Sequence, residues 1–159
     1  MCKALLAPLL LLAPAAFAQS DCAKPVVQLL RNGQPLAATA SALPAAATLR
    51  VAPDAGCPAQ EYRFRHAEVT LMRHGRPVLP ILLVEKPQAD LRPFLSYYQT
   101  GDQLNIFIAY QNVATVAADG TLTPLLPAKA ARRQPSQLDL RTTDSKGISF
   151  SLPLAKPAP

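Results

Sequence analysis

Two stretches of the sequence decide the fold class: Val27-Gln28-Leu29-Leu30-Arg31-Asn32-Gly33-Gln34-Pro35-Leu36 and Val69-Thr70-Leu71-Met72-Arg73-His74-Gly75-Arg76-Pro77-Val78. In each stretch a run of Val and Leu leads into a glycine-containing pair, and Asn-Gly is the strongest short hairpin signal because both turn positions need positive φ. Each stretch therefore predicts a strand, a tight turn and a returning strand. The two align without gaps, which indicates either an internal duplication or two hairpins that have converged on similar residues.

The composition supports a β-rich fold. A length of 159 residues suits one domain and excludes a large multidomain enzyme. A net charge of +6 with 50% hydrophobic residues excludes a disordered polyelectrolyte. The 17 prolines, the absence of Trp and an aromatic content of only 6% favour short strands joined by rigid turns over a helical bundle.

Alternation of apolar and polar residues predicts further short strands. They are expected at residues 49–52, 62–72, 104–110, 138–140 and 148–152, and Asp119-Gly120 predicts a two-residue hairpin turn. Val69 and Leu71 fall on the face opposite Tyr62 and Phe64, so the strand at 62–72 is expected to contain a bulge or break near His66-Ala67. Residues 37–47 are expected to form a poorly structured connection, and residues 155–159 a disordered tail.

One short helix is predicted near residues 90–99. Leu91, Phe94, Leu95 and Tyr98 form an apolar stripe at helical spacing, Asp90 is the expected cap, and Gly101 suits the left-handed end. The fold class is therefore all-β, an antiparallel β-sandwich or open barrel (Ig-like) with this one helix, in a single domain spanning residues 19–154.

The first 18 residues have the features of a secretory signal peptide. Lys3 gives a positive amino-terminal region, residues 4–15 are apolar, and Ala16-Phe17-Ala18 is an A-x-A cleavage site before Gln19. The apolar run is too short to cross a membrane, and no later stretch is long enough, so no transmembrane segment is expected in the mature chain. The expected location is the periplasm or the exterior of the cell.

Cleavage would remove Cys2 and leave Cys22 and Cys57, an even number in an oxidising compartment. A disulfide between Cys22 and Cys57 is the expectation. The alternatives are a lipid-bearing Cys22, a redox thiol or a metal ligand. Gln19-Ser20-Asp21 is not the small apolar approach of a lipobox, no C-x-x-C occurs, and only His66 and His74 are available to complete a metal set.

Export limits the partners that the net positive charge of the chain can attract. The mature charge is +5, from 15 basic minus 10 acidic residues after loss of Lys3. Export excludes cytoplasmic nucleic acid as a partner and leaves anionic envelope surfaces. The cluster Lys129, Arg132 and Arg133 is either a solvated loop or a binding patch.

No catalytic, cofactor-binding or metal-ligating set is predicted. His66 and Glu68 are either a general base with its partner or ordinary surface neighbours on a strand, and His74 is expected at a turn tip. Glu85, Asp90 and Asp102 are either a cation site or helix caps and turn residues. Ser41, Ser136, Ser149 and Ser151 are scattered and lie in no nucleophile elbow. Tyr98 is expected to pack inward and Tyr97 to face outward.

The segment from Phe64 to Leu126 resembles the C-terminal periplasmic domain of the gliding-motility and type IX secretion protein GldM. The resemblance rests on the order of a strand pair around residues 69–73, a helix at 91–95, the step Thr100-Gly101-Asp102-Gln103-Leu104 into Ile106-Phe107-Ile108, and the hairpin Ala118-Asp119-Gly120-Thr121-Leu122. It implies a β-rich periplasmic interaction domain without active-site residues. The chain lacks that family's membrane helix and preceding tandem domains.

The sequence therefore favours an exported, non-enzymatic binding or structural module of the cell envelope, acting with an envelope protein and in the family's setting with secretion or gliding machinery. The alternative is an exported hydrolase or enzyme inhibitor whose site the sequence does not reveal. The last strand, residues 148–152, is either a sheet edge available to a partner or an internal strand that ends at Pro153.

Overall fold

The computed structural model describes residues 24–37, 39–125 and 146–155. The predicted signal peptide, Cys22, the strand predicted at 138–140 and the cluster Lys129, Arg132 and Arg133 lie outside these ranges. The strands in the described ranges are β1 (Val26–Arg31), β2 (Gln34–Pro35), β3 (Ala46–Ala52), β4 (Glu61–Phe64), β5 (Ala67–Arg73), β6 (Arg76–Pro77), β7 (Leu82–Val84), β8 (Gln88–Asp90), β9 (Gln103–Ala109), β10 (Val113–Val116), β11 (Leu122–Pro124) and β12 (Gly147–Pro153). The helices in the same ranges are α1 (Arg92–Leu95) and the short 3-10 helix η1 (Tyr110–Asn112).

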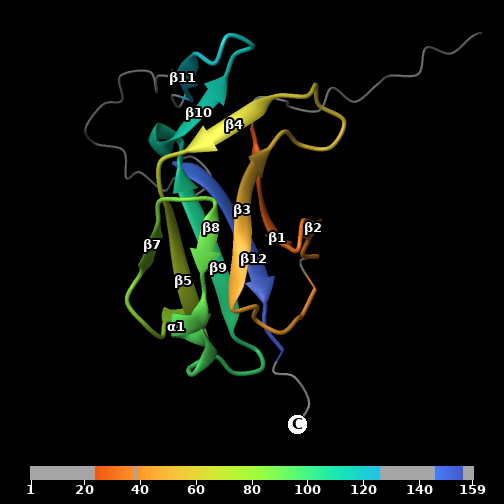
Figure 1. Ribbon diagram of the computed structural model, residues 1–159. Coiled ribbons are helices and arrows are strands. Elements are labelled where there is room, and N and C mark those ends of the chain that lie inside the picture. Colours follow the sequence, from red (N-terminus) through yellow and green to blue (C-terminus); the bar gives the residue numbers. More distant parts are fainter. Residues whose placement is uncertain (1–23, 38, 126–145, 156–159) are drawn as a thin grey trace, which may run out of the picture.

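The predicted fold class is confirmed: the described residues form a mostly β, sandwich-like fold with antiparallel sheets and one short α-helix. One sheet has the strand order β2-β1-β3-β8 and a second has the order β12-β9-β5-β6, with β7 also paired to β5. A third sheet, β11-β10-β4, lies at one end of these two (Figure 1).

The two similar stretches form equivalent hairpins. Asn32 and Gly33 have φ values of 52° and 78°, and His74 and Gly75 have 49° and 77°, so both turns have positive φ at both central positions. Leu30 pairs with Pro35 in the first hairpin, and Met72 pairs with Pro77 at the matching position of the second. Duplication and convergence both account for this equivalence.

The predicted break near His66-Ala67 separates two strands that belong to different sheets. β4 pairs with β10, whereas β5 pairs with β9. Val69 and Leu71 of β5 are fully buried, and the apolar side chains of β4 are only half-buried. The change of face predicted from the sequence is therefore the point at which the chain crosses from one sheet to the next.

Alternation correctly predicted the two long strands β9 and β12. β9 and β12 pair along their whole length, from Gly147 opposite Ala109 to Pro153 opposite Gln103. Every second side chain of each strand faces the interior, since burying one face of a sheet imposes a period of two. The core combines Val27, Leu29, Leu49 and Val51 from one sheet with Val69, Leu71, Leu104, Ile106, Ile108, Ile148 and Leu152 from the other.

The helix is present but shorter than predicted. It spans Arg92–Leu95, and its N-cap position is Leu91, because Asp90 is the last residue of β8 and pairs with Ala46. The carboxylate of Asp90 still accepts a hydrogen bond at 3.1 Å from the amide of Arg92, the first helical residue, so Asp90 does contribute to capping. Leu91, Phe94 and Tyr98 are buried as expected, but Leu95 is 37% exposed. Leu95 is therefore not part of the buried stripe, because the chain leaves the helix before a second turn forms.

Two loop predictions need correction. The β10–β11 hairpin has a longer turn than Asp119-Gly120 alone: the amide of Ala117 donates to the carbonyl of Thr121, and only Gly120 has positive φ. The connection predicted to be poorly structured includes the buried Leu43, and Ser41 forms a bridge with Leu154. Tertiary contacts with the last strand order this connection, and a local sequence pattern does not report such contacts.

Candidate functional site

The outer edge of β12 presents backbone groups that take no part in a ladder. The amide of Tyr110 donates to the carbonyl of Lys146, and the amide of Leu154 donates to the carbonyl of Asp102. The backbone N–H and C=O groups of the even-numbered residues of β12 therefore point toward β9. The N–H and C=O groups of Ser149 and Ser151 therefore face away from β9. Both serine side chains are exposed, and β12 ends the strand order of its sheet in the described part of the chain.

Part of this edge is covered. At its end, the amide of Ser41 donates to the carbonyl of Pro153 at 3.2 Å, and the amide of Ala155 donates to the carbonyl of Ser41 at 2.9 Å. β1 lies beside β12 without forming a ladder with it. The exposed stretch of the edge is therefore the one that contains Ser149 and Ser151.

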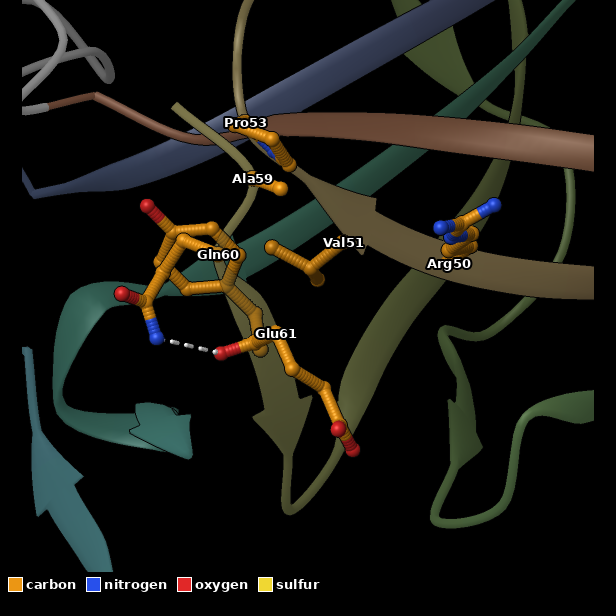
Figure 2. A pocket seen from close by; sticks show the side chains of 7 residues that line it. Arg50, Val51, Pro53, Ala59, Gln60 and Glu61 are labelled. Carbon is orange, nitrogen blue, oxygen red and sulfur yellow. Dashed lines mark hydrogen bonds between the residues drawn. The ribbon is translucent and has the colours of Figure 1, made fainter. Parts of the chain in front are cut away.

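An open groove of about 560 Å³ lies between the end of β3 and the start of β4. Figure 2 shows the side chain of Val51 directed toward Ala59 and Gln60, with Pro53 above them and the side chain of Arg50 turned away. The lining residues are Arg50, Val51, Pro53, Ala59, Gln60, Glu61 and Tyr62. The groove thus has an apolar centre and a polar margin, and its volume is within the range of roughly 300–1,000 Å³ typical of ligand sites.

Gln60 fixes the wall of the groove that β4 forms. Its amide nitrogen donates to the carbonyl of Glu61 at 3.2 Å and to the carbonyl of Val116 at 3.0 Å (Figure 2 shows the first of these bonds). These bonds tie the start of β4 to the end of β10. No local sequence pattern marks Gln60, because its second partner lies 56 residues away along the chain.

Asp102 is the only buried charged residue in the described part of the chain, with 2% of its surface exposed. Its carboxylate accepts two hydrogen bonds from Arg73 and one, at 2.8 Å, from the amide of Gln99. The hydrogen bonds from Arg73 lower the pKa of Asp102 below its usual value, although burial opposes them. This pair joins the β5–β6 hairpin to the turn before β9, and it explains Asp102 as a structural residue.

No ion pair joins either histidine to an acidic side chain in the described residues, although the charge of His74 helps to lower the pKa of the nearby Asp102. His66 Nε2 lies 2.9 Å from Asn112 Nδ2, and no hydrogen bond or ion pair joins His66 to Glu68. His74 occupies an exposed turn with positive φ, as predicted. The arrangement gives His66 a structural contact with η1 and supplies no base–acid pair.

The other candidate side chains are also dispersed. Asp90 pairs with the neighbouring Arg92, whose hydrogen bonds lower the pKa of Asp90 to about 2. In the described ranges no three His, Cys, Asp or Glu side chains form a group that could hold a metal ion. Ser151 Oγ donates to Asn105 Oδ1 at 2.6 Å, and Ser136 lies outside the described residues. Tyr98 is buried and Tyr97 is 53% exposed, as expected.

Comparison with protein-family models, with curated protein sequences and with solved structures finds no match. The resemblance to the GldM domain therefore stays a prediction from the sequence. In the described part of the chain, no helix is long and apolar enough to cross a membrane.

Proposed function

We propose that this protein is an exported, non-enzymatic binding or structural module of the cell envelope that associates with a protein partner through open strand edges. The observation that supports this most directly is the exposed stretch of β12, where Ser149 and Ser151 have small polar side chains and backbone groups with no ladder partner among the described residues. A partner strand can extend a sheet at such an edge by main-chain hydrogen bonds. The resemblance to the GldM domain suggests secretion or gliding machinery as the setting.

The proposal is tested by capturing envelope proteins with the mature protein and then measuring saturable binding of each purified candidate. The mature form is expected to begin at Gln19, and the intact mass of the exported protein checks this. A partner that binds with a defined stoichiometry supports the proposal. Turnover in hydrolase assays that is lost in His66→Ala or Glu68→Gln would replace it with the enzyme alternative.

Two proline variants test the contribution of β12. Ser149→Pro and Ser151→Pro each remove an amide that faces away from β9, so the β9–β12 ladder keeps its bonds. Partner binding is expected to fall in both variants while the far-ultraviolet circular dichroism spectrum is unchanged. Unchanged binding would move the contact to another surface, and unfolding would show that the edge is not free.

A further inference from the structure

The outer edge of β7 carries the two most exposed large apolar side chains in the described part of the chain. Leu83 is 60% exposed and Ile81 is 54% exposed, and a single residue separates them. β7 pairs with β5 and with no other described strand, and Figure 1 shows it at the left margin of the sandwich. An open strand edge with exposed apolar side chains is a template for pairing with another chain.

The backbone of Leu83 points away from β5. The amide of Val78 donates to the carbonyl of Leu71, so the N–H and C=O groups of the odd-numbered residues of β5 point toward β6 and β7. Leu83 pairs with Glu68, an even-numbered residue, and this position of an antiparallel pair has no ladder hydrogen bonds. The N–H and C=O groups of Leu83 therefore face outward and have no ladder partner among the described residues.

Two carboxylates beside this edge are unpaired in the described part of the chain. Glu68 lies directly opposite Leu83 on the outer face of the sheet, and Glu85 is exposed two residues beyond Leu83. Neither carboxylate forms an ion pair or a hydrogen bond with another described residue. Every other acidic residue in the described ranges has such a partner: Asp54, Glu61, Asp90, Asp102 and Asp119. In a chain of net positive charge, two unpaired negative charges at one edge favour a cationic partner.

We propose that the β7 edge binds an extended basic peptide segment of a partner protein, which pairs with β7 as an additional strand. The N–H and C=O groups of Leu83 hold the main chain of the segment. Lysine or arginine side chains of the segment cover Leu83 and Ile81 with their alkyl stems, and their charged groups pair with Glu68 and Glu85. This inference rests on the proposed binding function and names the chemistry of a partner segment.

Two prolines limit the length of the segment. Pro80 precedes Ile81 and Pro87 follows Lys86, and neither proline has an N–H to offer to an added strand. Pairing is therefore confined to the residues between the two prolines. A peptide of about five residues is long enough to span this stretch, because consecutive residues of paired strands advance at the same rise.

The probe is a fluorescein-labelled pentapeptide of alternating lysine and valine, with blocked ends, measured by fluorescence anisotropy against the mature protein. Saturable binding is expected. A matched peptide with glutamate in place of lysine is expected to bind at least about tenfold more weakly, because it places like charges near Glu68 and Glu85. The net positive charge of the chain alone would favour the glutamate peptide, so a preference for lysine reports the local site. A lysine–valine peptide with every backbone nitrogen methylated is expected to lose binding, because it has no amide donors.

A charge variant tests the two carboxylates. The double variant Glu68→Gln/Glu85→Gln removes both and is expected to weaken binding of the lysine–valine peptide at least about tenfold. Its control is Glu61→Gln/Asp90→Asn, which removes two exposed carboxylates elsewhere and changes the net charge by the same amount. This control is expected to bind the peptide as the wild type does.

A backbone variant tests strand pairing. Leu83→Pro removes an outward amide and leaves the hydrogen bonds between β5 and β7 in place, so binding of the peptide is expected to be lost. Its control is Ser149→Pro on the β12 edge, which is expected to leave peptide binding unchanged. Should Leu83→Pro fail to fold, Leu83→Ser, which removes the apolar side chain, takes its place and is expected to weaken binding.

Three outcomes would overturn the assignment of the β7 edge. The first is absence of saturable binding to the lysine–valine peptide, and the second is equal affinity of the wild type and Glu68→Gln/Glu85→Gln for it. The third is a dimer, seen by sedimentation velocity, that dissociates in Leu83→Pro, because it would assign the edge to a second copy of the chain. A purified envelope partner that binds Glu68→Gln/Glu85→Gln and Leu83→Pro normally would refute β7 as its contact while leaving the proposed function standing.

Discussion

Arg73 binds Asp102 with both ends of its guanidinium group, Nε lying 2.8 Å from Oδ1 and Nη2 lying 2.9 Å from Oδ2. Nη2 of Arg73 also donates to the carbonyl of Tyr97 at 2.9 Å. Arg73 ends β5, and Asp102 directly precedes β9, so this one side chain joins a hairpin, the segment after α1 and the start of the central strand. Arg31, at the matching position of the first hairpin, is exposed.

Replacing Asp102 by Asn is expected to lower the free energy of unfolding by about 2 kcal/mol, because a buried charge-assisted pair is lost at constant volume. Chemical denaturation measures the change. The matched control is Asp90→Asn, which breaks the exposed Asp90–Arg92 pair and should leave stability nearly unchanged. Equal changes in the free energy of unfolding for the two substitutions would mean that burial of Asp102 does not strengthen its pair with Arg73.

The same pair predicts a dependence of stability on pH. Because the folded-state pKa of Asp102 is lowered, its contribution is complete above the unfolded-state pKa of about 3.9 and is lost as the pH falls through the lower folded-state value. The difference in unfolding free energy between wild type and Asp102→Asn should therefore shrink below about pH 4. A difference that stays constant down to about pH 2 would contradict a lowered pKa.

The sequence predicts the parts of this fold that depend on local rules. Asn32-Gly33 determines a turn with positive φ, and the alternation in β9 and β12 follows from burial of one sheet face. The partner of Asp102 is not local, since Arg73 lies 29 residues away. The sequence indicates a cap or turn role for Asp102, in line with its hydrogen bond from the amide of Gln99, but no sequence pattern distinguishes Arg73 from the other arginines.

The helix shows how tertiary pairing overrides a local pattern. The spacing of Leu91, Phe94, Leu95 and Tyr98 fits a helix of about two turns, yet Asp90 pairs with Ala46 of β3 and the helix ends at Leu95. The groove between β3 and β4 could not be predicted from the sequence either, because it depends on the angle at which the chain leaves β3 and returns as β4. Composition and periodicity carry no information about that angle.

The buried stripe of α1 gives a second stability prediction. Phe94 is 2% exposed, so Phe94→Ala should cost about 3–5 kcal/mol by leaving a cavity between the helix and the sheets. Leu95→Ala is the matched control, because Leu95 is 37% exposed and should cost less than about 1 kcal/mol. Thermal or chemical unfolding of both variants compares them. A small effect of Phe94→Ala would mean that the helix is peripheral to the core.

Gly147 must lack a side chain for steric reasons. A Cβ atom there would lie 2.7 Å and 2.8 Å from two carbons of the Phe107 ring, and it would also meet the carbonyl oxygen of Ile108. Gly147→Ala is therefore expected to cost about 1–3 kcal/mol through overpacking. Adding Phe107→Ala to Gly147→Ala should relieve the steric clash with the Phe107 ring but not the clash with the carbonyl oxygen of Ile108. If Gly147→Ala unfolds at the same denaturant concentration as the wild type, β12 shifts more easily than its pairing with β9 implies.

The disulfide between Cys22 and Cys57 stays a prediction from the sequence, because Cys22 lies outside the described residues. Cys57 follows the end of β3 by five residues, and its amide donates to the carbonyl of Asp54 in a turn. A bond between Cys22 and Cys57 would stabilise the fold by an amount on the order of 4 kcal/mol.

Thiol labelling of the exported protein checks the disulfide. Without reductant the mature wild type should take up no label, and after reduction under denaturing conditions it should be labelled at both cysteines. Cys57→Ser should expose the thiol of Cys22, and Cys22→Ser that of Cys57, because each loses its expected partner. The double variant serves as the unlabelled control and should unfold at lower denaturant concentration than the wild type. Labelling of Cys22 and Cys57 in the native, unreduced wild type would refute the bond and return a redox or ligand role to these residues.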